Sequence, residues 1–182
     1  MSDQSALLNI YLQEYQTLKA EQTARIGFRD NLLYVTLAVF GGVLSFTLAN
    51  QNYDALLVIP WVCLILGWTY LVNDEKISAL GRYMRYTLAE RIMTLADTDD
   101  IEGVLGWETA HRSDPHRKRR KLEQLVVDQL TFVISGLISL TAFWLLVSPI
   151  PVILLLLSIL EGLLLLVLGV EIIVYADLAK GR

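Results

Sequence analysis

Glu161 is an acidic residue in the middle of a long apolar run, Ile150–Ala176. It lies eleven residues after Ile150, and at 1.5 Å per helical residue this is a depth of about 16 Å. That depth is close to the middle of a bilayer core about 30 Å thick. A carboxylate there is energetically costly, and such residues usually face a protein interior, a partner or a water path.

Two interpretations of Glu161 follow from this position. In the first, its carboxyl group belongs to an ion or proton path, or to a ring of carboxylates in an oligomeric pore. In the second, a protonated carboxyl group forms a structural hydrogen bond with Ser135, Ser139 or Thr141 of the preceding apolar run. Both interpretations stay open at this stage.

Two further carboxylates lie at the ends of the last two apolar runs that are far from the turn joining them. Asp128 is near the start of the third run, and Glu171 is near the end of the fourth. Arg25 and Arg29 precede the first apolar run at the same level. Because long arginine side chains can reach along apolar surface to a polar layer, we expect a salt-bridged cluster there. An inner gate built from the same charges is the alternative.

The segment around Glu108 holds the one compact group of metal-ligand residue types, with His111, Asp114 and His116 close behind. A carboxylate and two imidazoles could bind zinc. No cysteine accompanies them, and Pro115 interrupts the helix that would align them. We therefore expect a structural turn, with no metal and no cofactor.

Phosphate-binding and nucleophile motifs are missing from the sequence, so we expect no enzymatic activity.

Charges are segregated between Glu90 and Lys121. Carboxylates dominate up to Glu108, and bases dominate from Arg112 onward. The two halves could close on each other, bridge subunits, or expose the basic half to anionic headgroups. We expect the basic half to be a regulatory surface; its residues are Arg117, Lys118, Arg119, Arg120 and Lys121. Nucleic acid is not an expected partner, because no stacking aromatic residues interleave with the bases.

Four apolar runs must position these groups: Leu32–Ala49, Ala55–Val72, Leu125–Val147 and Ile150–Ala176. Each is close to the roughly 20 residues that cross a bilayer as a helix. All 15 Lys and Arg residues lie before, between or after the two pairs of runs. The short turns within each pair hold none. Positive segments stay in the cytoplasm, so the pattern predicts an all-α membrane protein.

The predicted organisation is two transmembrane hairpins with both chain ends in the cytoplasm. Residues 1–31 form a cytoplasmic arm, 32–72 the first hairpin, 73–124 a cytoplasmic linker, 125–176 the second hairpin and 177–182 a tail. The lipid bilayer is therefore the first expected partner. Small residues Ala38 and Gly42 give the first span a face for close helix contact.

The arm carries apolar residues at helical spacing: Leu8, Tyr11, Tyr15 and Leu18. This spacing predicts an amphipathic helix running from about Ala6 into the first span. Residues 75–95 show similar spacing, which predicts a helix continuing from the second span. We expect the two to pack together, within one chain or between subunits; an interfacial helix on the membrane is the alternative.

Three stretches resemble a group of small bacterial integral membrane proteins without an assigned activity: YQTLKAEQTARIGFRDN, GWTYLVNDEKISALGRYMR and GWETAHRSDPHRKRRK. The arm ending in GFRDN is also similar to the SLATT family. Those small membrane effectors are linked to bacterial nucleotide-signalling antiviral defence and are proposed to form pores. This chain has four spans rather than their usual pair, so the likeness assigns no residue.

These observations predict a homo-oligomeric inner-membrane pore or ion-channel-type effector controlled from the cytoplasm by a protein or nucleotide activator. Glu161 would line or support the path. The alternative is a non-conducting membrane scaffold that recruits a cytoplasmic partner.

Overall fold

The computed structural model describes residues 3–97, 105–106 and 116–176, and no strand occurs among them. The elements are α1 (Asp3–Asn50), the 3₁₀ turn η1 (Tyr53–Leu57), α2 (Val58–Tyr83), the π-helical turn η2 (Met84–Leu88), α3 (Ala89–Ala96), α5 (Arg117–Asp128), the π-helical segment η3 (Gln129–Ile134), α6 (Ser135–Leu146) and α7 (Val152–Tyr175). The all-helical prediction is confirmed for these residues.

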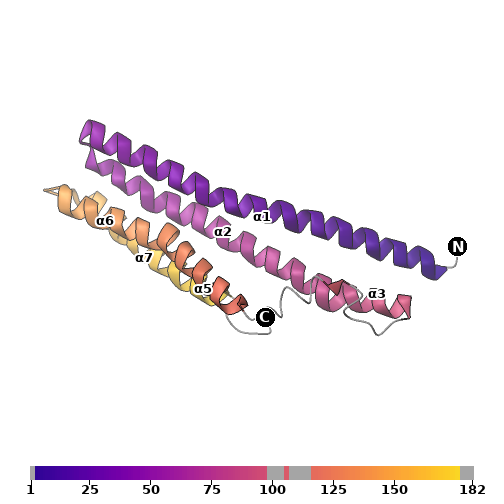
Figure 1. The fold of residues 1–182 in the computed structure, drawn as a ribbon. Helices are drawn as coiled ribbons and strands as arrows, with labels where there is room; N and C mark the ends of the chain where they lie inside the picture. The colour runs from indigo at the N-terminus through magenta and orange to yellow at the C-terminus, as the bar shows by residue number, and fades with distance from the viewer. Residues whose placement is uncertain (1–2, 98–104, 107–115, 177–182) are drawn as a thin grey trace. The chain divides into compact units, whose positions relative to one another are not determined.

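Four helical stretches are long and apolar enough to cross a membrane, and each overlaps one of the predicted runs. The first belongs to α1, a single helix of 48 residues that is drawn without a break in Figure 1. Proline is absent from α1, and its glycines leave the backbone hydrogen bonding intact. The prediction that the arm and the first span form one helix is confirmed.

The chain forms two compact units. The arm unit consists of residues 1–29 and 73–117, and the span unit consists of residues 30–72 and 118–182. Helices α1 and α2 each contribute to both units. Because α5 belongs to the span unit from its second residue, the bases from Lys118 onward are grouped with the apolar helices rather than with the arm.

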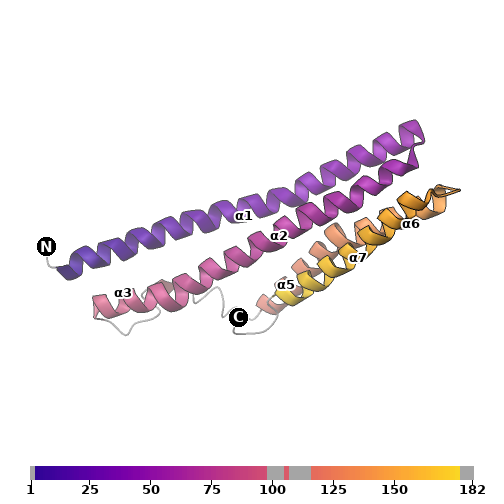
Figure 2. The same cartoon turned by 180° about the vertical axis from the view of Figure 1, so that it is seen from behind.

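The arm unit has a core in which Met84, Leu88 and Ile92 are almost completely buried. The apolar residues predicted along the arm, Leu8, Tyr11, Tyr15 and Leu18, pack against this core. Figure 2 shows the corresponding start of α1 beside the end of α2 and α3. The predicted contact between the arm and the helix after the second span is thus confirmed within one chain.

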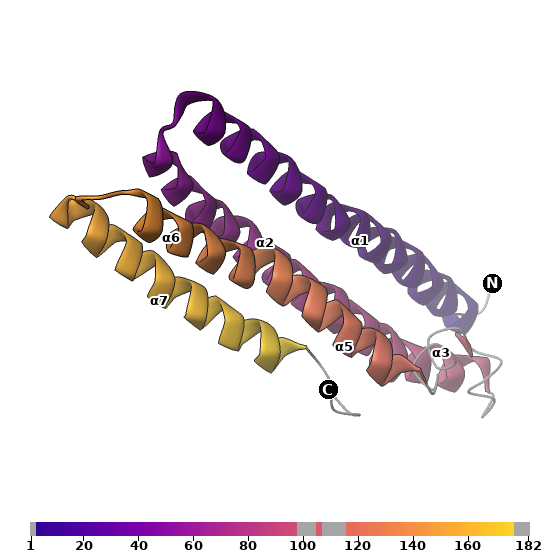
Figure 3. The ribbon, with the colours of Figure 1, turned by 60° about the vertical axis from the view of Figure 1, so that its left-hand side comes forward.

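The span unit has two apolar clusters. One is centred on Tyr70, Phe132 and Leu168, with the two aromatic rings 5.2 Å apart between centroids. The other joins Cys63 of α2 to Leu165 of α7 and to neighbouring residues of α6. Figure 3 shows α6 and α7 side by side. The core therefore runs along the buried faces of α2, α6 and α7.

Glycines make this packing close. A methyl group at Gly67 would lie 2.8 Å from a Leu168 carbon and 3.0 Å from Phe132 Cβ. At Gly136 it would lie 2.7 Å from a carbon of Leu165. Helices in lipid associate largely through such close van der Waals contact, so these two glycines hold α7 near its neighbours. By contrast, Gly42 of the predicted small-residue face has no atom within 4 Å among the described residues.

Candidate functional site

Glu161 belongs to the buried face of α7. The buried residues of this helix are Ser158, Glu161, Leu165, Leu168, Gly169 and Ile172, at the spacing of one helical face. The Glu161 side chain is 0 % exposed. Its carboxyl group is therefore enclosed within a single chain, which disfavours a ring of carboxylates between subunits.

Neither carboxyl oxygen of Glu161 has a hydrogen-bonding partner among the described residues. The Trp61 indole of α2 approaches the carboxyl group, but the geometry is not that of a hydrogen bond. Buried polar groups in native proteins are nearly always paired. An ionised carboxylate without a partner is more costly still in such surroundings. The Glu161 carboxyl group therefore contributes no hydrogen bond to the fold in this conformation.

The hydroxyl groups proposed as structural partners of Glu161 are engaged elsewhere. Ser139 Oγ donates to the backbone oxygen of Leu56 at 2.8 Å, and Thr141 Oγ1 donates to the backbone oxygen of Leu137 at 2.8 Å. Ser135 Oγ donates to the backbone oxygen of Leu130 at 2.7 Å. Helical Ser and Thr commonly bond to preceding carbonyl groups. The predicted structural hydrogen bond between Glu161 and one of these hydroxyl groups is therefore not formed in this conformation.

Other polar side chains of the span unit do bridge its helices. Trp144 Nε1 of α6 donates to Ser158 Oγ of α7 at 2.8 Å. Gln129 Nε2 donates to the backbone oxygen of Gly169 at 2.7 Å, from the first residue of η3. Thr47 Oγ1 and the Oδ1 atom of Asp128 are also buried without a hydrogen-bonding partner among the described residues. Within the described part of the span unit, Glu161 is the residue with both carboxyl oxygens in this state.

Asp128 and Glu171 occupy different environments. Asp128 is 7 % exposed at the last residue of α5, whereas Glu171 is half-buried near the end of α7. The arginines expected to join them have partners in the arm unit. Arg29 pairs with Asp74 at 2.7 Å, and Arg25 pairs with Glu21 at 2.6 Å. The salt-bridged cluster of Asp128 and Glu171 with these arginines stays a prediction.

The predicted regulatory surface starts α5. Lys118, Arg119 and Arg120 are exposed, and Lys121 is half-buried. Arg119 pairs with Glu123 one turn along, at 2.8 Å. The side chain of Arg117 lies outside the described residues, as do most of the acidic half and the candidate metal ligands Glu108, His111 and Asp114. Within the described part of the chain, no three metal-binding side chains come together.

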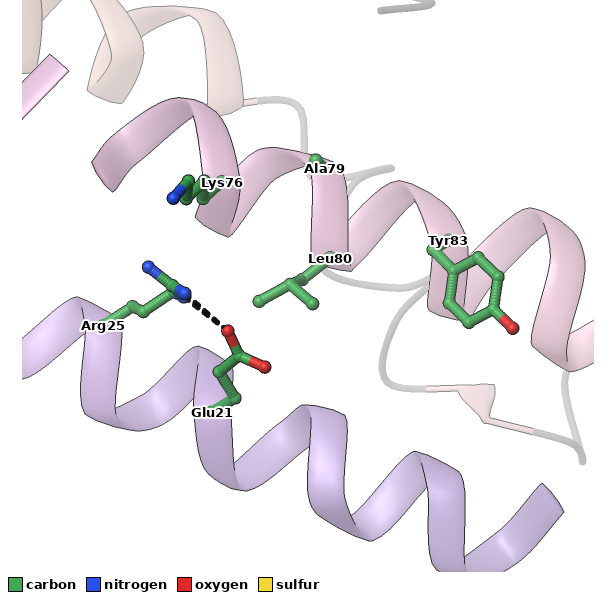
Figure 4. A pocket seen from close by; sticks show the side chains of 6 residues that line it. All are labelled: Glu21, Arg25, Lys76, Ala79, Leu80 and Tyr83. Carbon is green, nitrogen blue, oxygen red and sulfur yellow. Dashed lines mark hydrogen bonds and ion pairs between the residues drawn. The ribbon is translucent and has the colours of Figure 1, made fainter. Parts of the chain in front are cut away.

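A pocket of about 340 Å³ lies in the arm unit between α1 and α2. Its residues are Glu21, Arg25, Lys76, Ala79, Leu80 and Tyr83, as Figure 4 shows. Sequence patterns did not reveal it, because four of these residues come from a second helix whose register against α1 is a tertiary property.

Comparisons with protein-family models, with curated proteins and with solved structures find no match to this chain. A functional conclusion therefore depends on the residues and geometry of the chain itself.

Proposed function

We propose that this protein is a homo-oligomeric pore or channel-type effector of the bacterial inner membrane, controlled from the cytoplasm. The observation that carries the proposal is the fully buried carboxyl group of Glu161, without a hydrogen-bonding partner, in a helix apolar enough to cross a membrane. Polar groups within membrane spans that contribute little to packing usually mark ion or proton pathways.

The proposed topology has two transmembrane hairpins with the arm, the linker and both ends in the cytoplasm. Its support is the distribution of the 15 basic residues, which avoids both short turns. An activating protein or nucleotide would then reach the arm unit directly. The resemblance of the arm to SLATT effectors supports the same direction.

In this proposal, the described conformation is the closed state. The Glu161 carboxyl group is shielded by α2 and α6, and close contacts at Gly67 and Gly136 hold α7 against them. Conduction would require α7 to move away so that water reaches the carboxyl group. Since a hydrated carboxylate is ionised at neutral pH, the opened path would favour cations or protons over anions.

The test is ion flux through proteoliposomes, with the mass of the detergent-solubilised protein measured on the same sample. We expect flux from a defined oligomer, reduced at least tenfold by Glu161→Gln. Glu123→Gln is the matched control, because it removes the same charge from the same unit at an exposed position. If Glu161→Gln conducts as the wild type does, Glu161 has no role in the path.

A second candidate is a non-conducting scaffold that recruits a cytoplasmic partner. The observation that favours it is the exposed basic surface of Lys118, Arg119 and Arg120 at the start of α5. A scaffold would remain sealed in proteoliposomes and would keep its partner when Glu161 is changed. It would lose that partner when Lys118 and Arg120 are both replaced by Gln.

A further inference from the structure

The pocket of the arm unit has two ends of different chemistry. In Figure 4, the side chains of Arg25 and Lys76 lie toward one end and that of Tyr83 toward the other, with Leu80 between them. The apolar floor suits uncharged atoms, and the basic end suits an anion. The pocket thus combines a charged and an uncharged surface in about 340 Å³.

The two basic side chains of the pocket differ in whether they form an ion pair. Arg25 is held by Glu21, with its Nη2 atom 2.6 Å from the carboxylate. Lys76 is exposed, and it forms no ion pair or hydrogen bond with any described residue. The sum over Arg25, Lys76 and Glu21 is one net positive charge. Lys76 is therefore the principal unpaired cation of the pocket, and Glu21 competes with any anion for Arg25.

The basic end lies just beyond the first polar layer that follows the apolar residues of α2. In that layer, Asn73 Nδ2 donates to the backbone oxygen of Arg25 at 2.7 Å, and Arg29 pairs with Asp74 at 2.7 Å. Lys76 follows Val72, the last residue of the apolar run, by four residues, or about 6 Å along a helix. The headgroup layer of a bilayer is about 5–7 Å thick on each side. In the proposed topology, Lys76 therefore lies at the depth of lipid phosphates.

We infer that this pocket binds the headgroup of an anionic phospholipid. Lys76 and Arg25 contact the phosphate, and the uncharged part of the headgroup lies over Ala79 and Leu80. A zwitterionic lipid gains less, because its own cation cancels the phosphate charge. Free phosphate shares the charge chemistry but lacks acyl chains that anchor it at this depth. This inference rests on the proposed membrane topology but not on the proposed channel activity.

The test is a titration of the full chain in detergent with phosphatidylglycerol, with phosphatidylcholine and inorganic phosphate as separate competitors. Lys76→Gln should weaken phosphatidylglycerol binding about fivefold, as expected for one basic side chain near an anionic surface. Glu21→Gln should strengthen it, because Arg25 is released toward the phosphate. Arg82→Gln is the matched control, since Arg82 lies on the same helix, pairs with Glu75 and does not contact the pocket.

Each departure from this pattern overturns the inference. Equal losses for Lys76→Gln and Arg82→Gln would show non-specific attraction to the surface. Weaker binding after Glu21→Gln would remove the proposed competition for Arg25. Phosphatidylcholine that competes equally would exclude selection by charge, and displacement by millimolar inorganic phosphate would make free phosphate the ligand. All three side chains are on the surface, so helical content measured by circular dichroism should be unchanged.

Discussion

Two pairs of polar side chains in the arm unit contrast with Glu161 in the span unit. In the arm unit, the Tyr83 hydroxyl donates to Glu14 at 2.7 Å, and Arg29 pairs with Asp74. These acids and bases have partners across the helix contact. In the span unit, Glu161 is 0 % exposed and neither of its carboxyl oxygens has a partner.

This difference separates groups that stabilise the fold from a group that does not. A buried hydrogen bond contributes about 1 kcal/mol, whereas a buried polar atom left unpaired costs about 1–3 kcal/mol. The paired side chains of the arm unit are sufficiently explained by stability. Glu161 contributes no hydrogen bond in this conformation, and this supports the proposal that it acts in another conformation or on a hydrated path.

The largest effect is expected where the arm unit is packed most tightly. Leu88 is 0 % exposed in its core, and Leu88→Ala should destabilise this unit by about 2–5 kcal/mol through the lost contacts and the cavity. Hydrogen exchange along α3 in the detergent-solubilised full chain would measure the loss. Tyr86→Ala, at a position 58 % exposed, should accelerate exchange far less. Equal acceleration would mean that this core does not hold the unit together.

The second expected effect is in the span unit, where glycine packing replaces hydrogen bonding. Gly67→Ala should cost about 1–3 kcal/mol, because the new methyl group overlaps Leu168 and Phe132. Gly42→Ala should cost nothing, since its methyl group meets no atom of the described chain. Unfolding by a denaturing detergent, followed by tryptophan fluorescence, would compare them. A comparable loss at Gly42 would instead indicate a helix contact between subunits.

The third effect should have the opposite sign. Glu161→Met replaces the unpaired carboxyl group by an apolar side chain of similar length, and should stabilise the span unit by about 1–2 kcal/mol. The control Glu171→Met, at a half-buried position, should change stability less. The same unfolding assay applies. Destabilisation by Glu161→Met would reveal a stabilising interaction of the carboxyl group and would weaken the functional argument.

The sequence predicted the helices and one of their contacts because both depend on local patterns. The apolar runs defined the spans, and the spacing of Tyr11 and Tyr15 defined the arm surface that meets Met84. The place of Glu161 within a helix apolar enough to cross a membrane was also predictable from the run. Its lack of a partner was not, because Ser139 and Thr141 could have bonded to either the carboxyl group or the backbone.

The two π-helical segments were likewise beyond the reach of pattern analysis. A π-helical turn holds one more residue than an α-helical turn, and this small change in register leaves the apolar spacing of a short segment almost unaltered. In η3, it accompanies the bond from Gln129 to the backbone oxygen of Gly169, a contact with another helix. Such features depend on tertiary packing, which also determines the pocket around Lys76.

The smallest expected effect concerns the paired groups of the arm unit. Tyr83→Phe removes the bond to Glu14, and because this pair is half-buried the loss should be about 0.5–1 kcal/mol. The Glu14 carboxylate raises the pKa of the Tyr83 hydroxyl above its ordinary value of 10.0, since ionisation would break the hydrogen bond and place two negative charges together. The hydrogen bond therefore stabilises the folded state fully below pH 10 and is lost as pH rises through the higher folded pKa.

Hydrogen exchange along α3 should differ between wild type and Tyr83→Phe at neutral pH, and denaturant unfolding should show the difference shrinking above pH 10. A stability difference that persists above pH 10 would assign the effect to packing rather than to the hydrogen bond. Tyr83 and Glu14 would then no longer be an example of a stabilising polar pair to set against Glu161.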